Sequence, residues 1–434
     1  MIYPKKTLQS LFVLIILSIF TGCKKDKDTV YPTIEVIQPN NNATYNAADT
    51  IVVKAVFKDD KNLEYVSVKL ENDQNISIGT TKTFNPADNT YTLETTYILG
   101  DILTPTGKYT FDFIAFDGTN TKHEFIDIYL NEVPKTLKKI LLIGNNTGTE
   151  VYDFNQGNPQ LLAQFNGNPI NAYTDSKNQQ LWLLHNHSEI KLLETSSFTP
   201  RWTGGENCTQ SLPCLTASGF YNDEMYYASY YQKIKSLDKN GSFKFGYTLS
   251  NTNEFAEYIF ADDNFVFSEI KNYPNSTLKL QTNYELTSAF KQIYDYTYGY
   301  TDIIGMAPYG QNEYLILLNN NSGNAELLVY NTVSNSNWTP KTLPAQPASN
   351  FTAITDNEIL LTIGSTTYKY VISNNSLFTF FNQAYNNLFY EPLNNELYAI
   401  SNNQVDVYDY GSTQLKFSYT HFSSVNKIVF LYNK

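Results

Sequence analysis

The residues of this sequence best suited to chemistry are three cysteines and four histidines. Cys208 and Cys214 bracket the segment Thr-Gln-Ser-Leu-Pro, and two thiols this close can form a small disulfide loop in an oxidising compartment. No second His or Cys pair with metal-ligand spacing lies near them. We therefore predict a disulfide between Cys208 and Cys214. Cys23 follows an apolar segment near the amino terminus, which indicates a different fate for its thiol.

Two of the histidines, His185 and His187, lie two residues apart and would share one face of a strand. They could begin a zinc or copper site, which needs at least one more protein ligand, and none is evident locally. Asp262 and Asp263 lie in a turn, where Asp has a structural role. Gly-x-Ser-x-Gly, a phosphate-cradling Gly-rich loop and His-Glu-x-x-His are absent from the sequence. We expect no catalytic residue, no metal and no cofactor.

The amino-terminal segment predicts export. An apolar run from Leu11 to Phe20 follows two lysines. It is shorter than the roughly 20 helical residues that cross a bilayer, and it fits a signal peptide over residues 1–22. Phe20-Thr21-Gly22-Cys23 resembles the lipobox of bacterial lipoproteins, which implies acylation of Cys23 and cleavage before it. Several acyl chains at one residue give stable membrane anchoring.

Residues 23–32 form a short charged tether that resembles those of Bacteroidota outer-membrane lipoproteins. In that group, charged tethers often accompany display at the cell surface. The resemblance therefore implies a lipid-anchored outer-membrane protein, with the cell surface favoured over the periplasmic face. The periplasmic orientation stays open.

The composition predicts an all-β protein that does not bind nucleic acid. The 434 residues carry a net charge of −12, and no basic cluster follows the first 27 residues, whereas binders of nucleic-acid phosphates show a basic face. Tyr contributes 35 residues and Phe 27, and both favour strands. Asparagine runs such as 40–42 and 319–321 supply turns between strands.

Residues 33–132 predict a β-sandwich. Apolar residues alternate in 51–57, 66–70, 109–115 and 126–130, as in strands with one buried face. About seven short strands in this length suggest a sandwich, and the pattern resembles bacterial immunoglobulin-like and cadherin-like modules. Asp59, Asp60 and Asp117 could bind calcium, but turn chemistry is the better explanation for them.

After a linker at 133–137, a repeat fills residues 138–434. A polar turn followed by a short apolar strand recurs at Leu181, Met225, Phe265, Tyr314, Ile359 and Leu397, with a mean step of about 43 residues. This period suits a four-stranded propeller blade. We predict that the last strand, 425–431, pairs beside 140–143 and closes a ring of seven blades, with six or eight as alternatives, because an open ring would expose strand edges.

The repeat resembles the seven-bladed β-propellers of bacterial secreted proteins, including the YVTN and quinoprotein-like groups. Their signature motifs are absent from this sequence, so the resemblance implies a fold and carries over no cofactor or activity.

Aromatic residues indicate a binding face on the predicted propeller. Loops from each outer strand to the next inner strand share one face with the loops between second and third strands. Tyr offers a large rigid contact surface and a hydroxyl. The alternative is that these residues pack between blades. The candidates on this face are Trp202, Tyr230, Tyr231, Tyr273, Tyr296, Tyr298 and Tyr300.

Three functions remain for this predicted architecture. The leading hypothesis is a noncatalytic binding or scaffold lipoprotein whose propeller docks a protein partner. One setting for it is as a subunit of an outer-membrane secretion, transport or assembly complex. The second is a glycan-binding surface lipoprotein for nutrient uptake. The third is a propeller lyase or hydrolase.

Overall fold

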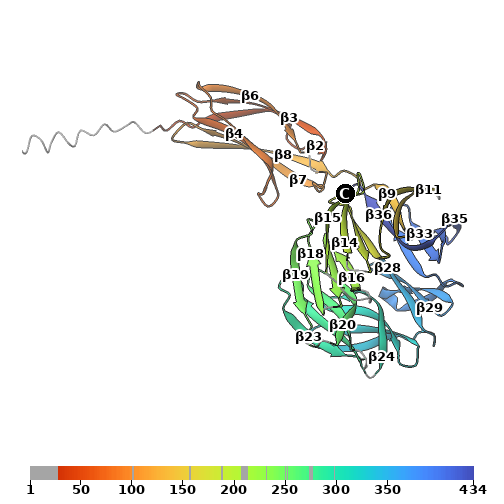
Figure 1. Ribbon diagram of the computed structural model, residues 1–434. Coiled ribbons are helices and arrows are strands. Elements are labelled where there is room, and N and C mark those ends of the chain that lie inside the picture. The colour runs from red at the N-terminus through yellow and green to blue at the C-terminus, as the bar shows by residue number, and fades with distance from the viewer. Residues whose placement is uncertain are drawn as a thin grey trace, which may run out of the picture. The chain divides into compact units, whose positions relative to one another are not determined.

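A computed structural model describes residues 28–99, 102–155, 158–186, 189–206, 214–230, 232–249, 251, 253–272, 277–297 and 299–434 (Figure 1). The chain divides into unit 1, Met1–Pro134, and unit 2, Lys135–Lys434, and the division falls within the predicted linker segment. Over the described ranges the regular elements are strands, with one 3-10 turn, η1 (Ile372–Asn374). No helix in these ranges is long and apolar enough to span a membrane.

Unit 1 contains two sheets. The strands are β1 (Thr33–Gln38), β2 (Ala43–Asn46), β3 (Thr50–Lys58), β4 (Tyr65–Asn72), β5 (Ser77–Phe84), β6 (Thr90–Ile98), β7 (Gly107–Phe116) and β8 (Thr121–Asn131). One sheet has the order β1-β3-β6 and the other β2-β8-β7-β4-β5. Ile51 and Phe57 of β3 and Phe111 and Phe113 of β7 are fully buried in one core shared by both sheets. The period-two pattern of these strands thus identified the buried faces correctly.

Within the described residues, unit 2 contains seven four-stranded antiparallel sheets. Six of them take four consecutive strands each. These are β12 (Pro169–Asp175), β13 (Gln180–His185), β14 (Glu189–Glu194) and β15 (Thr199–Gly205); β16 (Leu215–Tyr221), β17 (Glu224–Ser229), β18 (Lys233–Leu237) and β19 (Phe243–Thr248); β20 (Glu254–Ala261), β21 (Phe265–Asn272), β22 (Thr277–Tyr284) and β23 (Phe290–Asp295); β24 (Tyr300–Gly310), β25 (Glu313–Asn320), β26 (Ala325–Asn331) and β27 (Ser336–Lys341); β28 (Ala348–Thr355), β29 (Glu358–Ile363), β30 (Thr366–Val371) and β31 (Ser376–Phe381); and β32 (Asn387–Glu391), β33 (Glu396–Ser401), β34 (Gln404–Asp409) and β35 (Leu415–Thr420).

The seventh sheet joins the two ends of unit 2. It contains β9 (Leu137–Asn145), β10 (Thr149–Asn155), β11 (Asn158–Phe165) and the last strand, β36 (Ser424–Tyr432). β36 pairs antiparallel with β9, and Ile428 lies opposite Leu142 (Figure 1). The predicted pairing of the final strand beside residues 140–143 is therefore confirmed.

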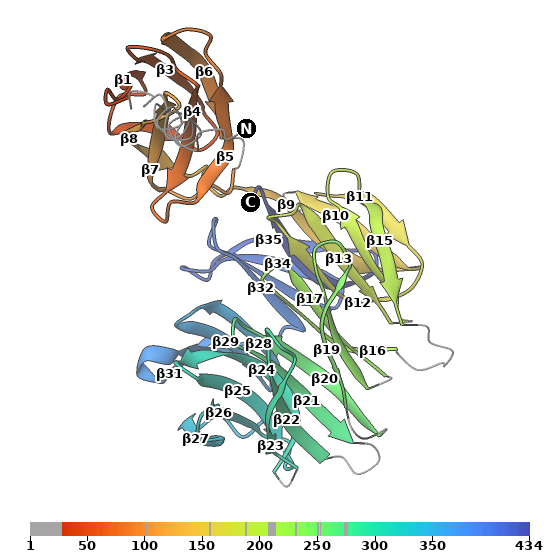
Figure 2. The same cartoon turned by 90° about the vertical axis from the view of Figure 1, so that its left-hand side faces the viewer.

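Hydrogen bonds from the innermost strands or the strands beside them connect each sheet to the next, so the sheets form a closed β-propeller ring (Figure 2). In order, the donors and acceptors are Asn426 Nδ2 to Pro169 O, Asn171 Nδ2 to Ser218 Oγ, Thr216 Oγ1 to Ala256 O, Met306 N to Tyr258 OH, Asn319 Nδ2 to Ala348 O, Thr352 Oγ1 to Leu388 O, and Asn387 Nδ2 to Asn426 O.

The repeated polar turn precedes the second strand in the six sheets that take four consecutive strands. All residues of β13 and β17 are buried, which explains why this apolar strand dominates the repeat in the sequence. In the turns before the second strands, Gln179, Asn222, Asn312 and Asn395 have positive φ values, a backbone conformation that Asn tolerates better than most residues. Turn geometry therefore explains the polar half of the repeat.

Six of the seven innermost strands in the described part of unit 2 shift register near the end at which they begin. The shifts occur in β12, β16, β20, β24, β28 and β36, whereas β32 pairs regularly with β33. Such bulges bend a strand and re-aim the adjacent side chains. We call this side of the ring, where the innermost strands begin, the start face.

Candidate binding face

The aromatic residues predicted to bind a ligand are used for packing where the structure describes them. Tyr296 is only 2% exposed, its ring centre lies 4.6 Å from that of Tyr294, and its hydroxyl accepts a hydrogen bond from Asn337 Nδ2. The prediction that Tyr296 belongs to a binding surface is wrong, because a fully packed ring cannot contact a ligand. Tyr300 is half-buried, and its hydroxyl donates to Glu326 Oε2 at 2.8 Å.

Trp202 and Tyr230 are also half-buried. The Trp202 ring lies 6.2 Å from that of Trp182, and a Cβ atom on Gly241 of the next sheet would lie 2.4 Å from it. Tyr230 stacks on Phe255 with ring centres 4.6 Å apart. Packing between sheets thus accounts for both residues. Tyr231, Tyr273 and Tyr298 lie outside the described residues, as does Cys23, the predicted lipidation site.

Cys214 connects two loops of the start face. It is fully buried, its N–H donates to Asn186 O, and its carbonyl accepts from Tyr230 N, both at 2.8 Å. Cys208, its predicted disulfide partner, lies outside the described residues. The disulfide between these two residues therefore stays a prediction.

The histidine pair does not assemble a metal site in the described part of the chain. His185 is 1% exposed, its Nδ1 lies 3.2 Å from Glu189 O, and burial lowers its pKa. His187 lies outside the described residues. His185 is thus a buried residue held by a neighbouring strand.

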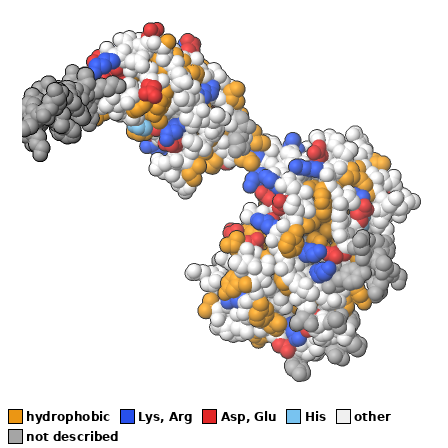
Figure 3. Space-filling model, turned by 60° about the vertical axis from the view of Figure 1, so that its left-hand side comes forward, with side chains coloured by type: hydrophobic (Ala, Val, Ile, Leu, Met, Phe, Trp, Pro, Cys, Tyr) orange, Lys and Arg blue, Asp and Glu red, His pale blue; other side chains and the backbone are white. Residues whose placement is uncertain are grey.

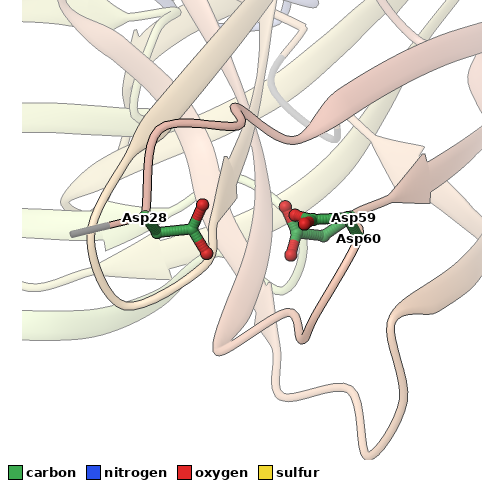
Figure 4. A group of neighbouring side chains, drawn as sticks. All are labelled: Asp28, Asp59 and Asp60. Atoms are coloured by element: carbon green, nitrogen blue, oxygen red, sulfur yellow. The ribbon is translucent and has the colours of Figure 1, made fainter. Parts of the chain in front are cut away.

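In unit 1, carboxylate oxygens of Asp28, Asp59 and Asp60 lie within 4.8 Å of one another (Figure 4). Asp59 Oδ1 accepts the backbone N–H groups of Lys61 and Asn62, and Lys61 Nζ lies 2.9 Å from Asp28 Oδ2. The third predicted calcium candidate, Asp117, accepts the N–H groups of two residues of its own turn. Turn hydrogen bonds and a lysine therefore already use most of these carboxylates.

A more open site on the start face was not predicted. A cavity of about 460 Å³ lies between β36, β12 and β32, and we call it the Lys427 cavity. Its lining consists of six asparagines (145, 171, 386, 387, 402 and 426) together with Ile170, Phe389, Ser424, Val425 and Lys427. The register shift of β36 lies between Val425 and Lys427, and as a result the consecutive side chains of Asn426 and Lys427 both line the cavity.

Lys427 carries the only cationic side chain among the residues that line this cavity. Its ammonium contacts Asn171 Oδ1 and lies 4.4 Å from the centre of the Tyr173 ring. No carboxylate of the described residues forms an ion pair with it. Desolvation lowers the pKa of Lys427 from its ordinary 10.5 to about 8.

A second cation near the same face has the opposite environment. Lys271 Nζ lies 2.6 Å from Asp302, 2.8 Å from Glu257 and 3.6 Å from Glu269. Glu269 is buried, and desolvation raises its pKa to about 7. Lys271 is therefore neutralised within the protein, whereas Lys427 is not.

On the outer strands and turns of unit 2, four apolar side chains of three consecutive sheets are exposed. Phe243 is 64% exposed, Leu286 89%, Phe290 59% and Val333 74%. They come from three consecutive sheets, which are joined by hydrogen bonds from Gly246 N to Ser288 Oγ and from Lys291 Nζ to Thr332 O. We call these four residues the rim patch. On the face drawn in Figure 3, acidic and basic side chains are interspersed.

No known protein family and no curated protein matches the sequence. Among solved structures, a quinoprotein alcohol dehydrogenase-like protein from Bacteroides thetaiotaomicron is 10% identical, with a TM-score of 0.47 over 94% of this chain and 100% of that chain. BamB from Moraxella catarrhalis is 10% identical, with a TM-score of 0.40 over 67% of this chain and 92% of that chain. The β-propeller domain of Swd1 from Myceliophteria thermophila is 9% identical, with a TM-score of 0.47 over 60% of this chain and 88% of that chain. At these identities the similarity concerns the fold alone.

Proposed function

We propose that this chain is a noncatalytic binding or scaffold protein of the outer membrane, anchored by lipid on Cys23, whose ring is a seven-bladed propeller that docks a protein partner. The anchor rests on the signal-peptide and lipobox patterns of the sequence. The blade count is supported by the seven four-stranded sheets of the described residues, and an immunoglobulin-like unit 1 by two sheets around one core.

The observation that carries protein docking is the rim patch. Single exposed apolar residues are ordinary on protein surfaces, but neighbouring ones from several elements mark interaction sites. Leu286 and Val333 lie in turns between strands, where polar residues would satisfy the chain equally well. A partner with apolar side chains would remove these residues from water.

The test is purification of the tagged full chain from its native membrane, with a charged patch variant beside it. We expect a stoichiometric protein partner with the wild type and its loss with Leu286→Asp/Phe290→Asp. Phe378→Asp/Leu393→Asp is the matched control, because these residues are also exposed but lie on other sheets. A partner retained by the patch variant, or no stoichiometric partner with the wild type, would contradict the proposal.

A further inference from the structure

The Lys427 cavity differs from three other cavities of unit 2 in having a half-buried cation as its only charged lining residue. Two of the others lie at the opposite face, against the ends of β24 and β20, and contain Asp356 or the pair Asp262 and Asp263. A third contains Glu194 together with Lys139, which pairs with Asp153 at 2.6 Å, and the exposed, solvated side chains of Lys138 and Arg201. In the Lys427 cavity a cation faces a polar space without a carboxylate from the described residues.

Burial of this ammonium is unfavourable in the free protein. The amide oxygen of Asn171 and the ring of Tyr173 offset only part of the lost hydration, which is why the pKa of Lys427 falls. An anionic group of a ligand would supply the missing counter-charge. The first chemical requirement on a ligand is therefore a negative group at Lys427 Nζ.

The asparagines add a second requirement. The side-chain amides of Asn145 and Asn402 hydrogen-bond to no described group, and Asn387 and Asn426 use only their Nδ2 atoms. Each free amide offers both donors and an acceptor. An inorganic anion such as phosphate mainly accepts hydrogen bonds, with one or two O–H donors at neutral pH, and would leave most of the Oδ1 atoms unpaired. A ligand with several hydroxyl groups can donate and accept at once.

The third requirement comes from Phe389. Its half-buried ring lies on the β32 side of the cavity, 6.0 Å from Lys427 Nζ. The ring offers an apolar face next to the amides. The ring of a sugar likewise combines apolar and polar parts, because its faces carry C–H groups and its edge carries hydroxyl groups.

We propose that the Lys427 cavity binds a uronic acid unit, with its carboxylate at Lys427, its hydroxyls at the free asparagine amides and its C–H face on Phe389. This inference is independent of protein docking at the rim patch, because it concerns different residues and a different class of ligand. The proposed binding of the uronic acid is noncovalent and involves no chemical step.

The experiment is isothermal titration of the purified full-length protein with galacturonic acid and glucuronic acid. Galactose and glucose are the neutral controls, acetate and inorganic phosphate are the simple anions, and tri-alanine presents a carboxylate on a peptide. We expect a uronic acid to bind about tenfold or more tightly than its neutral sugar, since a hydrogen bond to a charged group is the strongest single contact offered. The simple anions and tri-alanine should bind more weakly still.

Variants locate the binding. Lys427→Met should weaken uronic acid binding by about tenfold to a hundredfold. Asn145→Ala removes a side chain without a described hydrogen-bond partner, so it should fold normally and weaken binding by a smaller factor. Lys233→Met is the matched control, because this lysine lies at the start face outside the cavity and pairs with Glu206.

Four outcomes would overturn the proposal. They are no measurable binding of either uronic acid by the wild type, equal binding of the neutral sugars, equal or tighter binding of acetate, phosphate or tri-alanine, and unchanged binding by both Lys427→Met and Asn145→Ala. A Lys427→Met protein that does not fold leaves the decision to Asn145→Ala and to the ligand series, which need no lysine variant.

Discussion

The ammonium of Lys427 lies 4.4 Å from the centre of the Tyr173 ring, across the junction between the last strand of the chain and the first strand of the next sheet. Lys271, which lies near the same face on another sheet, is instead surrounded by three acidic side chains. The comparison separates a lysine that stabilises the fold from one that the fold tolerates.

Lys427→Met should stabilise unit 2 at neutral pH by at most about 3 kcal/mol, from the difference between an ordinary pKa of 10.5 and about 8 in the folded protein. The folded state disfavours the charged form, so the wild type carries this cost below pH 8. The cost declines as the pH rises from 8 toward 10.5, and the advantage of methionine should disappear over that range. Urea unfolding at pH 7 and pH 10 measures it.

Loss of the contact between Lys427 and Asn171 should cost little stability in the Lys427→Met variant. The Oδ1 atom of Asn171 still accepts the N–H of Ala172 at 3.0 Å. Lys233→Met serves as the control, with little expected change, since exposed ion pairs contribute little. Equal stability of Lys427→Met and wild type at pH 7 would show that the ammonium is well solvated in the cavity.

The last strand holds the ring closed, and its loss should unfold unit 2 cooperatively. Ile428 is 1% exposed and lies in one core cluster with Leu142 and Tyr398. Ile428→Ala should cost about 2 to 5 kcal/mol of unfolding free energy, as large-to-small core substitutions do. Ile293→Ala, at a residue 39% exposed on an outer strand, should cost well under half as much.

Urea unfolding followed by tyrosine and tryptophan fluorescence checks this difference. If the two substitutions have equal effects, β36 does not contribute to the stability of the ring.

The sequence predicted those parts of the fold whose burial is periodic. The second strands, such as β13 and β17, are fully buried, and their apolar runs recur at nearly constant spacing. The closing strand followed from the same repeat, because residues 425–431 had no other sheet to join. Regular burial of this kind leaves a direct pattern in the order of residue types.

The candidate site could not be predicted in the same way. Asn171, Asn387 and Asn402 look like turn residues in a sequence with many asparagines, and only the closed ring brings them together. The register shift at Asn426, which turns consecutive side chains toward one cavity, leaves no composition signal. The one available clue was Lys427 itself, the single charge within a mostly apolar last strand.

At the predicted aromatic face, the sequence suggested a binding residue where the structure has a packed one. Tyr296 lies in a tyrosine-rich segment that could equally be exposed or packed, and its 2% exposure decides for packing. Composition does not tell a ring on the surface from a ring between sheets, because Tyr serves both environments.

The disulfide predicted between Cys208 and Cys214 should appear as one cross-linked peptide when the protein is digested without reduction. A loop of this length should stabilise unit 2 by about 2 kcal/mol. Cys208→Ser should therefore lower the unfolding midpoint, and dithiothreitol should lower it in the wild type but not in Cys208→Ser. Free thiols at both positions in protein isolated from the envelope would contradict the prediction.

The acidic group in unit 1 provides the last prediction. Asp59 Oδ1 accepts two backbone N–H groups, and Lys61 pairs with Asp28, so the carboxylates stabilise a turn without a metal ion. Removal of calcium with a chelator should leave the unfolding temperature unchanged.

Asp59→Ala should cost about 1 to 2 kcal/mol of unfolding free energy, as loss of a side-chain acceptor for backbone N–H groups does. Asp59→Asn should cost less, because an amide oxygen can also accept these N–H groups. Asp60→Ala is the matched control, because Asp60 is exposed. Thermal unfolding with and without millimolar calcium measures all four proteins. A calcium-dependent rise in the wild type that Asp60→Ala abolishes would show that these carboxylates bind the ion, and the turn would then be only part of their role.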